Sequence, residues 1–292
     1  MKPPPFEYHR PDSVEEAVRL LAELPGAKVL AGGQSLIPLL NFRLAAPANL
    51  VDISRLDELR SITVGSDGVC IGAAVTHAEV ERNERVAQAC PLLRQAEQLV
   101  AHEVIRNKGT AVGSIVHADP SGELTAVLAL LRGSVVLRST DGERVVAAND
   151  FFVGPLEADL RPGELAVEAR FPELGPSSGT AFEEVARRHG DYALAGCAAH
   201  VAFDVGGRIR TSHLAFISVA PTPLTLDLWE LTEGGQIDDV DAGAVYDLVT
   251  QALDPEPDIH ATADYRRHLA GTLAVRALAA AAERASAPAP AS

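Results

Sequence analysis

The first 150 residues alternate between short apolar runs and stretches with apolar residues at helical spacing, which is typical of a mixed α and β domain. Val14, Ala17, Val18 and Leu21 predict one face of an amphipathic helix over 13–24, with Asp12 or Ser13 as its N-cap. Pro25-Gly26 ends this helix. Short apolar and β-branched runs then predict strands at 28–31, 50–53, 62–64 and 69–75.

The next segment carries a second group of helices. Thr76 and Glu79 have the spacing of a capping box, so we expect His77 to begin a helix rather than to bind a ligand. Apolar periodicity predicts helices over 91–105 and 124–131. Between these helices, about twenty residues contain a break in the helical pattern, a run of small residues and a turn. This arrangement suits contacts with a ligand's phosphate, ribityl chain or ring.

The pattern changes in the last third of the chain. We interpret residues 175–179 as a linker, followed by a hairpin with strands at 196–204 and 209–219 around Gly206-Gly207. His200 and His213 could face one another across this hairpin, but a two-histidine metal site without a carboxylate is not expected. The sequence then predicts two helices, at 241–253 and 262–284. The Ala/Pro/Ser tail at 286–292 is predicted to be disordered.

Composition narrows the possible classes of protein. The 292 residues carry 25 Lys+Arg against 40 Asp+Glu, a net charge of −15, which argues against nucleic acid as the main partner. Aromatic residues make up only 4%, so the core must consist mainly of Ala, Val and Leu. The apolar runs are too short for a membrane span, and no secretory signal is visible. We therefore expect a cytoplasmic protein.

The cysteines point the same way. Cys70, Cys90 and Cys197 stand far apart without a CxxC motif. This spacing excludes a disulfide framework, and it excludes a zinc site or an iron–sulfur cluster that this chain holds alone.

A glycine pair follows the strand predicted at 28–31. Gly32-Gly33 allows positive φ angles and a close approach of the backbone to a ligand, while Gln34 and Ser35 add side-chain donors. Successive N–H groups in such a turn can converge on an anion without a basic surface. The alternative is a plain turn between a strand and a helix, and neither a G-x-G-x-x-G motif nor a P-loop lysine is present.

Four segments together resemble one protein family. AGGQSLIPLLNFR at 31–43 and IRNKGTAVGSIVHADPSGEL at 105–124 look like the FAD-binding medium subunit of molybdenum hydroxylases, as in carbon monoxide dehydrogenase-type enzymes and xanthine dehydrogenases. FFVGPLEADLRPGEL at 151–165 and AFEEVARRHGDYALAGCAA at 181–199 fit in the same order.

The resemblance implies an α+β fold. It implies a vanillyl-alcohol-oxidase (PCMH)-type FAD-binding domain of two α/β lobes over 1–175. A smaller α+β domain of the CO dehydrogenase flavoprotein C-terminal type would cover 176–285, before the tail at 286–292.

The resemblance also implies the cofactor contacts. Residues 31–35 match the family's first pyrophosphate loop and 110–114 the second, which usually reads Thr-Ile-Gly-Gly-Asn or -Ser. Glu123 takes the acidic position that contacts ribose or ribityl hydroxyls, Leu160 is the apolar residue beside the cofactor, and Asp191-Tyr192 lie in the segment that faces the isoalloxazine. The implied FAD-binding residues are Ala31, Gly32, Gly33, Gln34, Ser35, Thr110, Ala111, Gly113, Ser114, Glu123, Leu160, Asp191 and Tyr192, with no catalytic residue and no metal ligand.

One position departs from the family pattern. Val112 replaces the first glycine of the second loop, and its side chain could narrow the approach to the pyrophosphate, although a backbone N–H is retained. Simpler roles are open for other residues: Glu123 as a helix-start acid, Asp119 and His117 as turn residues, and Tyr192 as part of the core. The basic run Arg187-Arg188-His189 could be a solvated surface or an ion-pair site.

The family implies an electron-transfer subunit of a heterotrimeric molybdenum hydroxylase. A large molybdopterin subunit would oxidise the substrate, and a small subunit with two [2Fe–2S] clusters would pass electrons to FAD in this chain. The assembly would be an (αβγ)2 hetero-oligomer, cytoplasmic or held at the inner face of the membrane through its electron acceptor. The alternatives are a stand-alone flavin oxidase or dehydrogenase of the same superfamily, and a scaffold protein that has lost the flavin. The substrate and the acceptor stay open.

Overall fold

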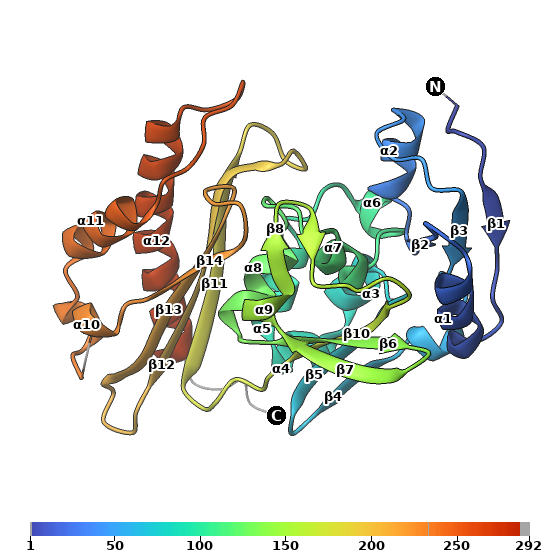
Figure 1. The fold of residues 1–292 in the computed structure, drawn as a ribbon. Coiled ribbons are helices and arrows are strands. Elements are labelled where there is room, and N and C mark those ends of the chain that lie inside the picture. The colour runs from blue at the N-terminus through green and yellow to red at the C-terminus, as the bar shows by residue number, and fades with distance from the viewer. Residues whose placement is uncertain (1, 233, 287–292) are drawn as a thin grey trace.

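The computed structural model describes residues 2–232 and 234–286. Its N-terminal lobe is a small parallel sheet of order β1-β3-β2, seen in blue in Figure 1. The predicted first helix is confirmed, because the Ser13 hydroxyl caps it by accepting a hydrogen bond from the Glu16 N–H at 3.1 Å. The elements of this lobe are β1 (Glu7–His9), α1 (Val14–Glu23), β2 (Lys28–Leu30), α2 (Leu36–Asn41) and β3 (Asn49–Asp52).

The second lobe is a five-stranded antiparallel sheet of order β4-β5-β10-β6-β7. The capping box at Thr76 is present as predicted, with the Glu79 side chain bonded back to the cap. The elements of this lobe are η1 (Asp57–Leu59), β4 (Ile62–Gly65), β5 (Gly68–Gly72), α3 (His77–Arg82), α4 (Glu84–Ala89), α5 (Pro91–Glu97), α6 (Glu103–Arg106), α7 (Ala111–His117), α8 (Glu123–Leu130), β6 (Ser134–Ser139), β7 (Gly142–Ala147), α9 (Ala148–Phe151), β8 (Phe152–Gly154), β9 (Glu157–Ala158) and β10 (Leu165–Phe171).

The helix predicted over 91–105 is two helices. α5 ends at Glu97, and α6 begins only at Glu103, after Ala101 adopts a positive φ of 43°. The prediction was wrong here because Val100 and Ile105 continue the apolar pattern across a bend that no glycine or proline marks. The split matters for the site, because α6 leads directly into the second glycine-containing loop.

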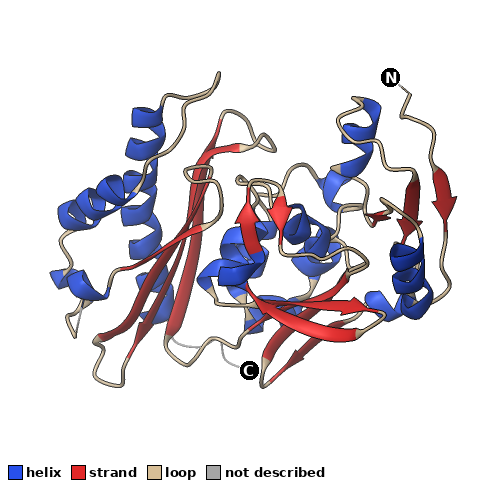
Figure 2. Ribbon diagram, viewed as in Figure 1, coloured by secondary structure: helices blue, strands red, loops and turns tan. Residues whose placement is uncertain are grey.

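The C-terminal part is a four-stranded antiparallel sheet of order β11-β12-β13-β14 with helices beside it (Figure 2). The predicted hairpin is confirmed, and His200 pairs with His213 across it. The elements are β11 (Ser178–Ala186), β12 (Ala193–Phe203), β13 (Ile209–Ile217), β14 (Leu224–Asp227), α10 (Trp229–Thr232), η2 (Ile237–Asp239), α11 (Ala242–Ala252) and α12 (Ala263–Ser286).

The interpretation of 175–179 as a linker was wrong at its C-terminal end. Ser178 and Gly179 are the first two residues of β11. A Cβ at Gly179 would lie 2.1 Å from the carbonyl oxygen of Ala281, so the glycine here allows α12 to pack directly on the strand. Of the predicted tail, Ser286 is the last residue of α12, and the others lie outside the described residues.

Strand β12 separates two hydrophobic cores. Ala198 faces the first core, which fills the two N-terminal lobes and reaches this sheet, whereas Cys197 and Ala199 face a second core beneath α11 and α12. Both faces of the strand are buried, as its run of small residues requires. The low aromatic content fits this construction. In the described part of the chain, no helix is both long enough and apolar enough to cross a bilayer.

Candidate cofactor site

The two glycine-containing loops meet at a cavity of about 390 Å³. The loop after β2 forms one wall and the loop that enters α7 forms the next, while residues around β9 and the start of β10 close the rest. The cavity is lined by Lys28, Val29, Ala31, Gly32, Gly33, Gln34, Ser35, Leu36, Leu39, Ala45, Ile53, Ala73, Gly109, Thr110, Val112, Gly113, Ser114, Val116, His117, Leu156, Leu160, Leu165 and Ala166.

The first loop brings residues 32–35 to the wall of this cavity. Gly33 has a φ of +73°, a conformation that favours glycine. A Cβ at Gly32 would lie 2.2 Å from the Lys108 carbonyl oxygen, so only glycine lets the two loops touch. In the described part of the chain, none of the four N–H groups of residues 32–35 donates a hydrogen bond to another protein group. Backbone N–H groups without a protein partner in one loop can together bind an anion.

The second loop is more fully bonded within the protein. The Ala111 N–H donates to Val75, and the N–H groups of Gly113 and Ser114 donate to the Thr110 side chain and carbonyl. Only the N–H of Val112 is left among these four. Val112 is 1% exposed, lies in the first turn of α7 and has no positive φ, so this position does not require glycine.

A buried ion pair stands behind the second loop. The Nδ1 atom of His77 lies 2.7 Å from Oε2 of Glu97, and its Nε2 atom lies 2.8 Å from the Ser114 hydroxyl. His77 is 2% exposed and Glu97 is 0% exposed. The sequence correctly predicted His77 as the first residue of a helix, but this contact was missed because its members are far apart along the chain.

The remaining predicted site residues lie outside the cavity lining. Glu123 begins α8, where burial and then the negative charge of Glu184 from β11 raise the pKa of its carboxyl to about 8. Asp191 forms ion pairs with Arg188 and Arg187 at 3.3 and 3.8 Å, and Tyr192 beside it is exposed. Ala111 is in the core, and only its backbone belongs to the loop.

The turn that carries Asp191 and Tyr192 nevertheless reaches the N-terminal half of the molecule. A Cβ at Gly190 would lie 2.4 Å from the His102 ring, and the rings of His102 and His189 stand edge to face with centroids 5.9 Å apart. His102 immediately precedes α6. The β11–β12 turn therefore packs beside the entry to the second loop.

The sequence reasoning also missed part of the cavity wall. Among the described residues, Lys28 is the one lysine or arginine that lines the cavity, and Leu156 adds to the apolar side beside Leu160. Arg144 holds this segment by hydrogen bonds to Glu164 at 2.7 Å and to the Asp159 carboxylate at 2.8 Å. Lys28 lies on the strand just before the glycine pair. This closeness in sequence could have indicated that Lys28 lies near the same cavity.

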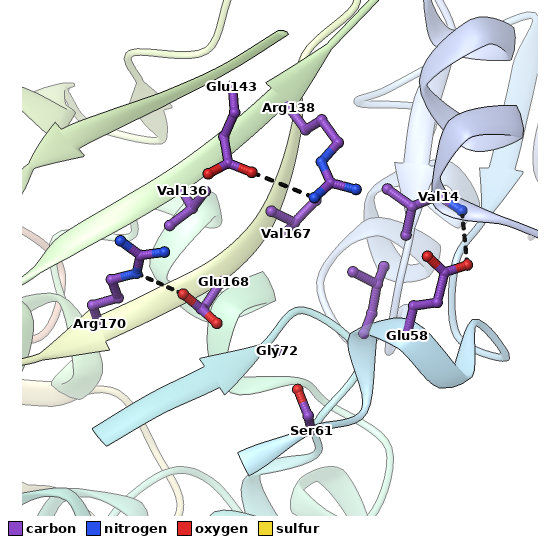
Figure 3. A pocket seen from close by; sticks show the side chains of 11 residues that line it. Val14, Glu58, Ser61, Gly72, Val136, Arg138, Glu143, Val167, Glu168 and Arg170 are labelled. Carbon is purple, nitrogen blue, oxygen red and sulfur yellow. Dashed lines mark hydrogen bonds and ion pairs between the residues drawn. The ribbon is translucent and has the colours of Figure 1, made fainter. Parts of the chain in front are cut away.

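A second cavity, of about 230 Å³, lies beside α1 at the five-stranded sheet (Figure 3). Four of its charged side chains form ion pairs, Arg138 with Glu143 at 3.4 Å and Arg170 with Glu168 at 2.6 Å. The fifth, Glu58, accepts a hydrogen bond from the Val14 N–H at 3.4 Å. Both arginines of this cavity are therefore already neutralised by carboxylates. Among the described residues, no cluster of three His, Cys, Asp or Glu side chains could hold a metal ion.

The fold agrees with comparisons to known proteins. Residues 4–174 match the model of the FAD binding domain in molybdopterin dehydrogenase, and 180–281 match the CO dehydrogenase flavoprotein C-terminal domain. The chain belongs to this family of molybdenum hydroxylase flavoproteins. It is an FAD-binding oxidoreductase subunit of the medium-chain type, and the expected fold is confirmed.

The similarity extends over nearly the whole chain. It is 40% identical to the 6-hydroxypseudooxynicotine dehydrogenase complex subunit alpha of Paenarthrobacter nicotinovorans, over 98% of this chain and 97% of the relative. It is 37% identical to the carbon monoxide dehydrogenase medium chain of Hydrogenophaga pseudoflava, over 96% and 98%. The structure of quinoline 2-oxidoreductase from Pseudomonas putida 86 superposes with a TM-score of 0.92 at 37% identity, over 98% and 99% of the two chains.

The residues present fit the cofactor of this family. The free N–H groups of the first loop, the adjoining Ser114 hydroxyl and the single Lys28 suit a pyrophosphate, and the leucines opposite suit an apolar ring. In the second loop, three of the four amides at 111–114 are already bonded within the protein, which leaves the Val112 N–H and the Ser114 side chain.

Proposed function

We propose that the loop at 32–35 binds the FAD pyrophosphate through its backbone N–H groups, with Ser114 and the Val112 N–H completing the cradle. The single observation that carries this proposal is that residues 32–35 line the cavity while none of their four N–H groups has a hydrogen-bond partner among the described residues. Leu156 and Leu160 would cover an apolar part of the cofactor. Lys28 would add one positive charge in a chain whose net charge is −15.

The remaining expected contacts belong to the same proposal. Glu123 would bind ribityl or ribose hydroxyls, since a carboxyl with a pKa of about 8 is protonated at neutral pH and can both donate and accept. The turn at Asp191-Tyr192 would face the isoalloxazine from the C-terminal side. Its packing against His102 supports this placement.

We further propose that this subunit transfers electrons within a heterotrimer. When bound, FAD supplies the redox chemistry, accepting single electrons from iron–sulfur clusters and giving up two to an acceptor. The protein positions and shields the cofactor, and it needs no general acid or base. A small [2Fe–2S] subunit and a large molybdopterin subunit would complete the complex, in an (αβγ)2 assembly.

The location and the domain organisation are proposals of the same kind. All three cysteines are free thiols, and Cys90 and Cys197 are buried, which suits a reducing compartment such as the cytoplasm. A boundary near residue 175, with an FAD domain before it and a C-terminal domain over 176–285, is supported by the family matches that end at 174 and resume at 180. The substrate would be selected by the large subunit.

Purification of the chain from its native host tests this function. We expect roughly one FAD per chain, together with co-purifying iron–sulfur and molybdopterin chains. Substrate oxidation by the lone flavin-loaded chain would instead favour a stand-alone oxidase. A chain that neither carries nor takes up FAD on reconstitution would contradict the proposal and favour a scaffold that has lost its flavin.

A further inference from the structure

The second loop is fastened to the start of α3 by backbone and side-chain contacts. The His77 N–H donates to the Gly109 carbonyl at 3.0 Å, and Thr76 pairs with Thr110 in an isolated β-bridge. The His77 ring then continues inward, between Ser114 on one side and Glu97 on the other. Ser114 itself lines the cavity, so a buried acidic group is linked to the cavity surface through a single imidazole.

We propose that the His77–Glu97 pair is a positioning device, which turns the Ser114 hydroxyl into a hydrogen-bond donor toward the FAD pyrophosphate. This inference rests on the proposed function. Ser114 is the group that matters in this loop because the N–H groups of Ala111, Gly113 and Ser114 are already bonded to the protein.

The proton on the pair determines the direction of the Ser114 hydroxyl. If the pair holds one proton in addition to the imidazole N–H, Nε2 carries hydrogen whether the shared proton lies on Nδ1 or on Glu97. Nε2 then donates to Ser114, whose own O–H is free to donate to an anion. If the pair loses that proton, Nδ1–H donates to the carboxylate and Nε2 becomes an acceptor. Ser114 must then donate to His77 and present lone pairs to the phosphate.

The surroundings favour the protonated pair. Burial lowers the pKa of His77, but the charge and the hydrogen bond of Glu97 outweigh it and raise the pKa above its ordinary value. Burial likewise raises the pKa of Glu97, against the opposing effect of His77. The Oε1 atom of Glu97 has no hydrogen-bond partner among the described residues, so the imidazole is the direct partner of this carboxyl.

Other charged groups act on the pair from neighbouring elements. Arg106 from α6 lowers the pKa values of both members, whereas Glu123 from α8 raises that of His77 and Glu81 from α3 raises that of Glu97. Glu123 is in turn influenced by Glu184 of β11. Of these groups, Glu123 and Glu184 have pKa values raised to about 8 and about 7, and any pH experiment must separate their effects from that of the His77–Glu97 pair.

The test measures FAD affinity against pH with the intact subunit stripped of its flavin. Titrations that follow flavin fluorescence from about pH 6 to about pH 9 give the dissociation constant, Kd, at each pH. For the wild type, we expect Kd to rise about tenfold as the pair loses its proton, since a hydrogen bond to a charged phosphate is lost. Glu123→Gln alters the proposed ribityl contact and so changes Kd itself, but it removes the titration of this carboxyl, and the rise of Kd with pH should remain.

Two further variants show whether His77 acts through Ser114. Ser114→Ala should weaken FAD binding about tenfold at low pH and flatten the profile. His77→Gln should also flatten it, and the double variant should bind no more weakly than Ser114→Ala alone. Circular dichroism confirms that each variant is folded. If His77→Gln does not fold, the profiles of Ser114→Ala and Glu123→Gln still decide the question.

The outcomes separate this inference from the proposed function. A wild-type subunit that binds no FAD at any pH overturns both. A subunit that binds FAD overturns only the inference if Ser114→Ala keeps the wild-type pH profile. The inference also fails if His77→Gln weakens binding equally with and without the serine hydroxyl, since its role would then be structural.

Discussion

Replacement of Gly32 by alanine gives a direct test of how the two loops form the cavity. The added Cβ would lie 2.2 Å from the Lys108 oxygen and 2.6 Å from the Gly109 Cα, whereas ordinary contact begins at 3.4 Å. Both neighbours are backbone atoms. The segment 108–109 cannot retreat easily, because Gly109 is hydrogen bonded to both Ile105 and His77. The first loop must therefore shift by about 1 Å.

The magnitude follows from this steric conflict. Overpacking of this kind costs about 1–3 kcal/mol. If the cost is felt in the FAD-binding conformation, Kd rises roughly 5- to 150-fold. The steric effect should dominate at Gly32, which has no positive φ. A valine at the same position should abolish flavin retention on purification, because its branched side chain enlarges the same conflict.

Two other glycines provide matched controls for Gly32→Ala. Gly26→Ala introduces a Cβ at a φ of +65° with no atom within 4 Å, so it reports the backbone strain alone. Gly33→Ala combines a φ of +73° with contacts of 3.1 and 3.3 Å to the side chains of Ile37 and Leu30, which can move. We expect the loss of FAD affinity to be largest for Gly32→Ala and negligible for Gly26→Ala, measured by fluorescence titration. An unchanged Kd for Gly32→Ala would refute the assignment of this loop to the pyrophosphate.

Three further outcomes are expected. Val112→Gly should lower the free energy of unfolding, measured by urea titration, by about 2–3 kcal/mol. The FAD Kd should stay within about threefold, because the backbone N–H is retained. A much lower Kd would show that the valine side chain obstructs the site. The raised pKa of Glu123, about 8, means that its deprotonation destabilises the flavin-free fold, so stability falls as pH rises from 4.5 toward 8. Glu123→Gln should make this fall shallower, and the remainder is expected from Glu184, whose pKa burial raises to about 7. A slope equal to that of the wild type would assign the fall elsewhere. Arg144→Leu should leave Glu164 with only the Arg161 N–H as a hydrogen-bond partner, lower the free energy of unfolding by about 1–3 kcal/mol and weaken FAD binding, and a Tm equal to that of the wild type would contradict this.

Features set by neighbouring residues could be predicted from the sequence. The cap at Ser13, the capping box at Thr76 and Glu79, and the hairpin at Gly206-Gly207 each depend on residues within a few positions of one another. The loop after β2 was predictable as a turn, because a glycine pair directly after a strand is a common turn signal, whereas its anion-binding role came from the family resemblance. The secondary structure predicted at these positions is confirmed. The cofactor contacts assigned to them stay predictions.

Features that depend on distant contacts could not be predicted in the same way. His77, Glu97 and Ser114 meet only because α3, α5 and α7 pack together, and their separations along the chain are 20 and 37 residues. The glycine at 179 suggested a flexible connection, but its neighbour is α12, about 100 residues away in sequence. A glycine that permits close packing and a glycine that permits flexibility look the same in one sequence.

The division of β12 between two cores has a consequence for exchanging parts between relatives. α8 packs against one side of the C-terminal sheet and α12 against the other. A chimera joined near residue 175 would bring a foreign β12 against the native α8, whose first residue is Glu123. In such a chimera, the side chains of the foreign β12 would not match those of the native α8, even if each part came from a well-folded parent. A successful graft of the C-terminal part would have to carry the facing surface of α8 with it.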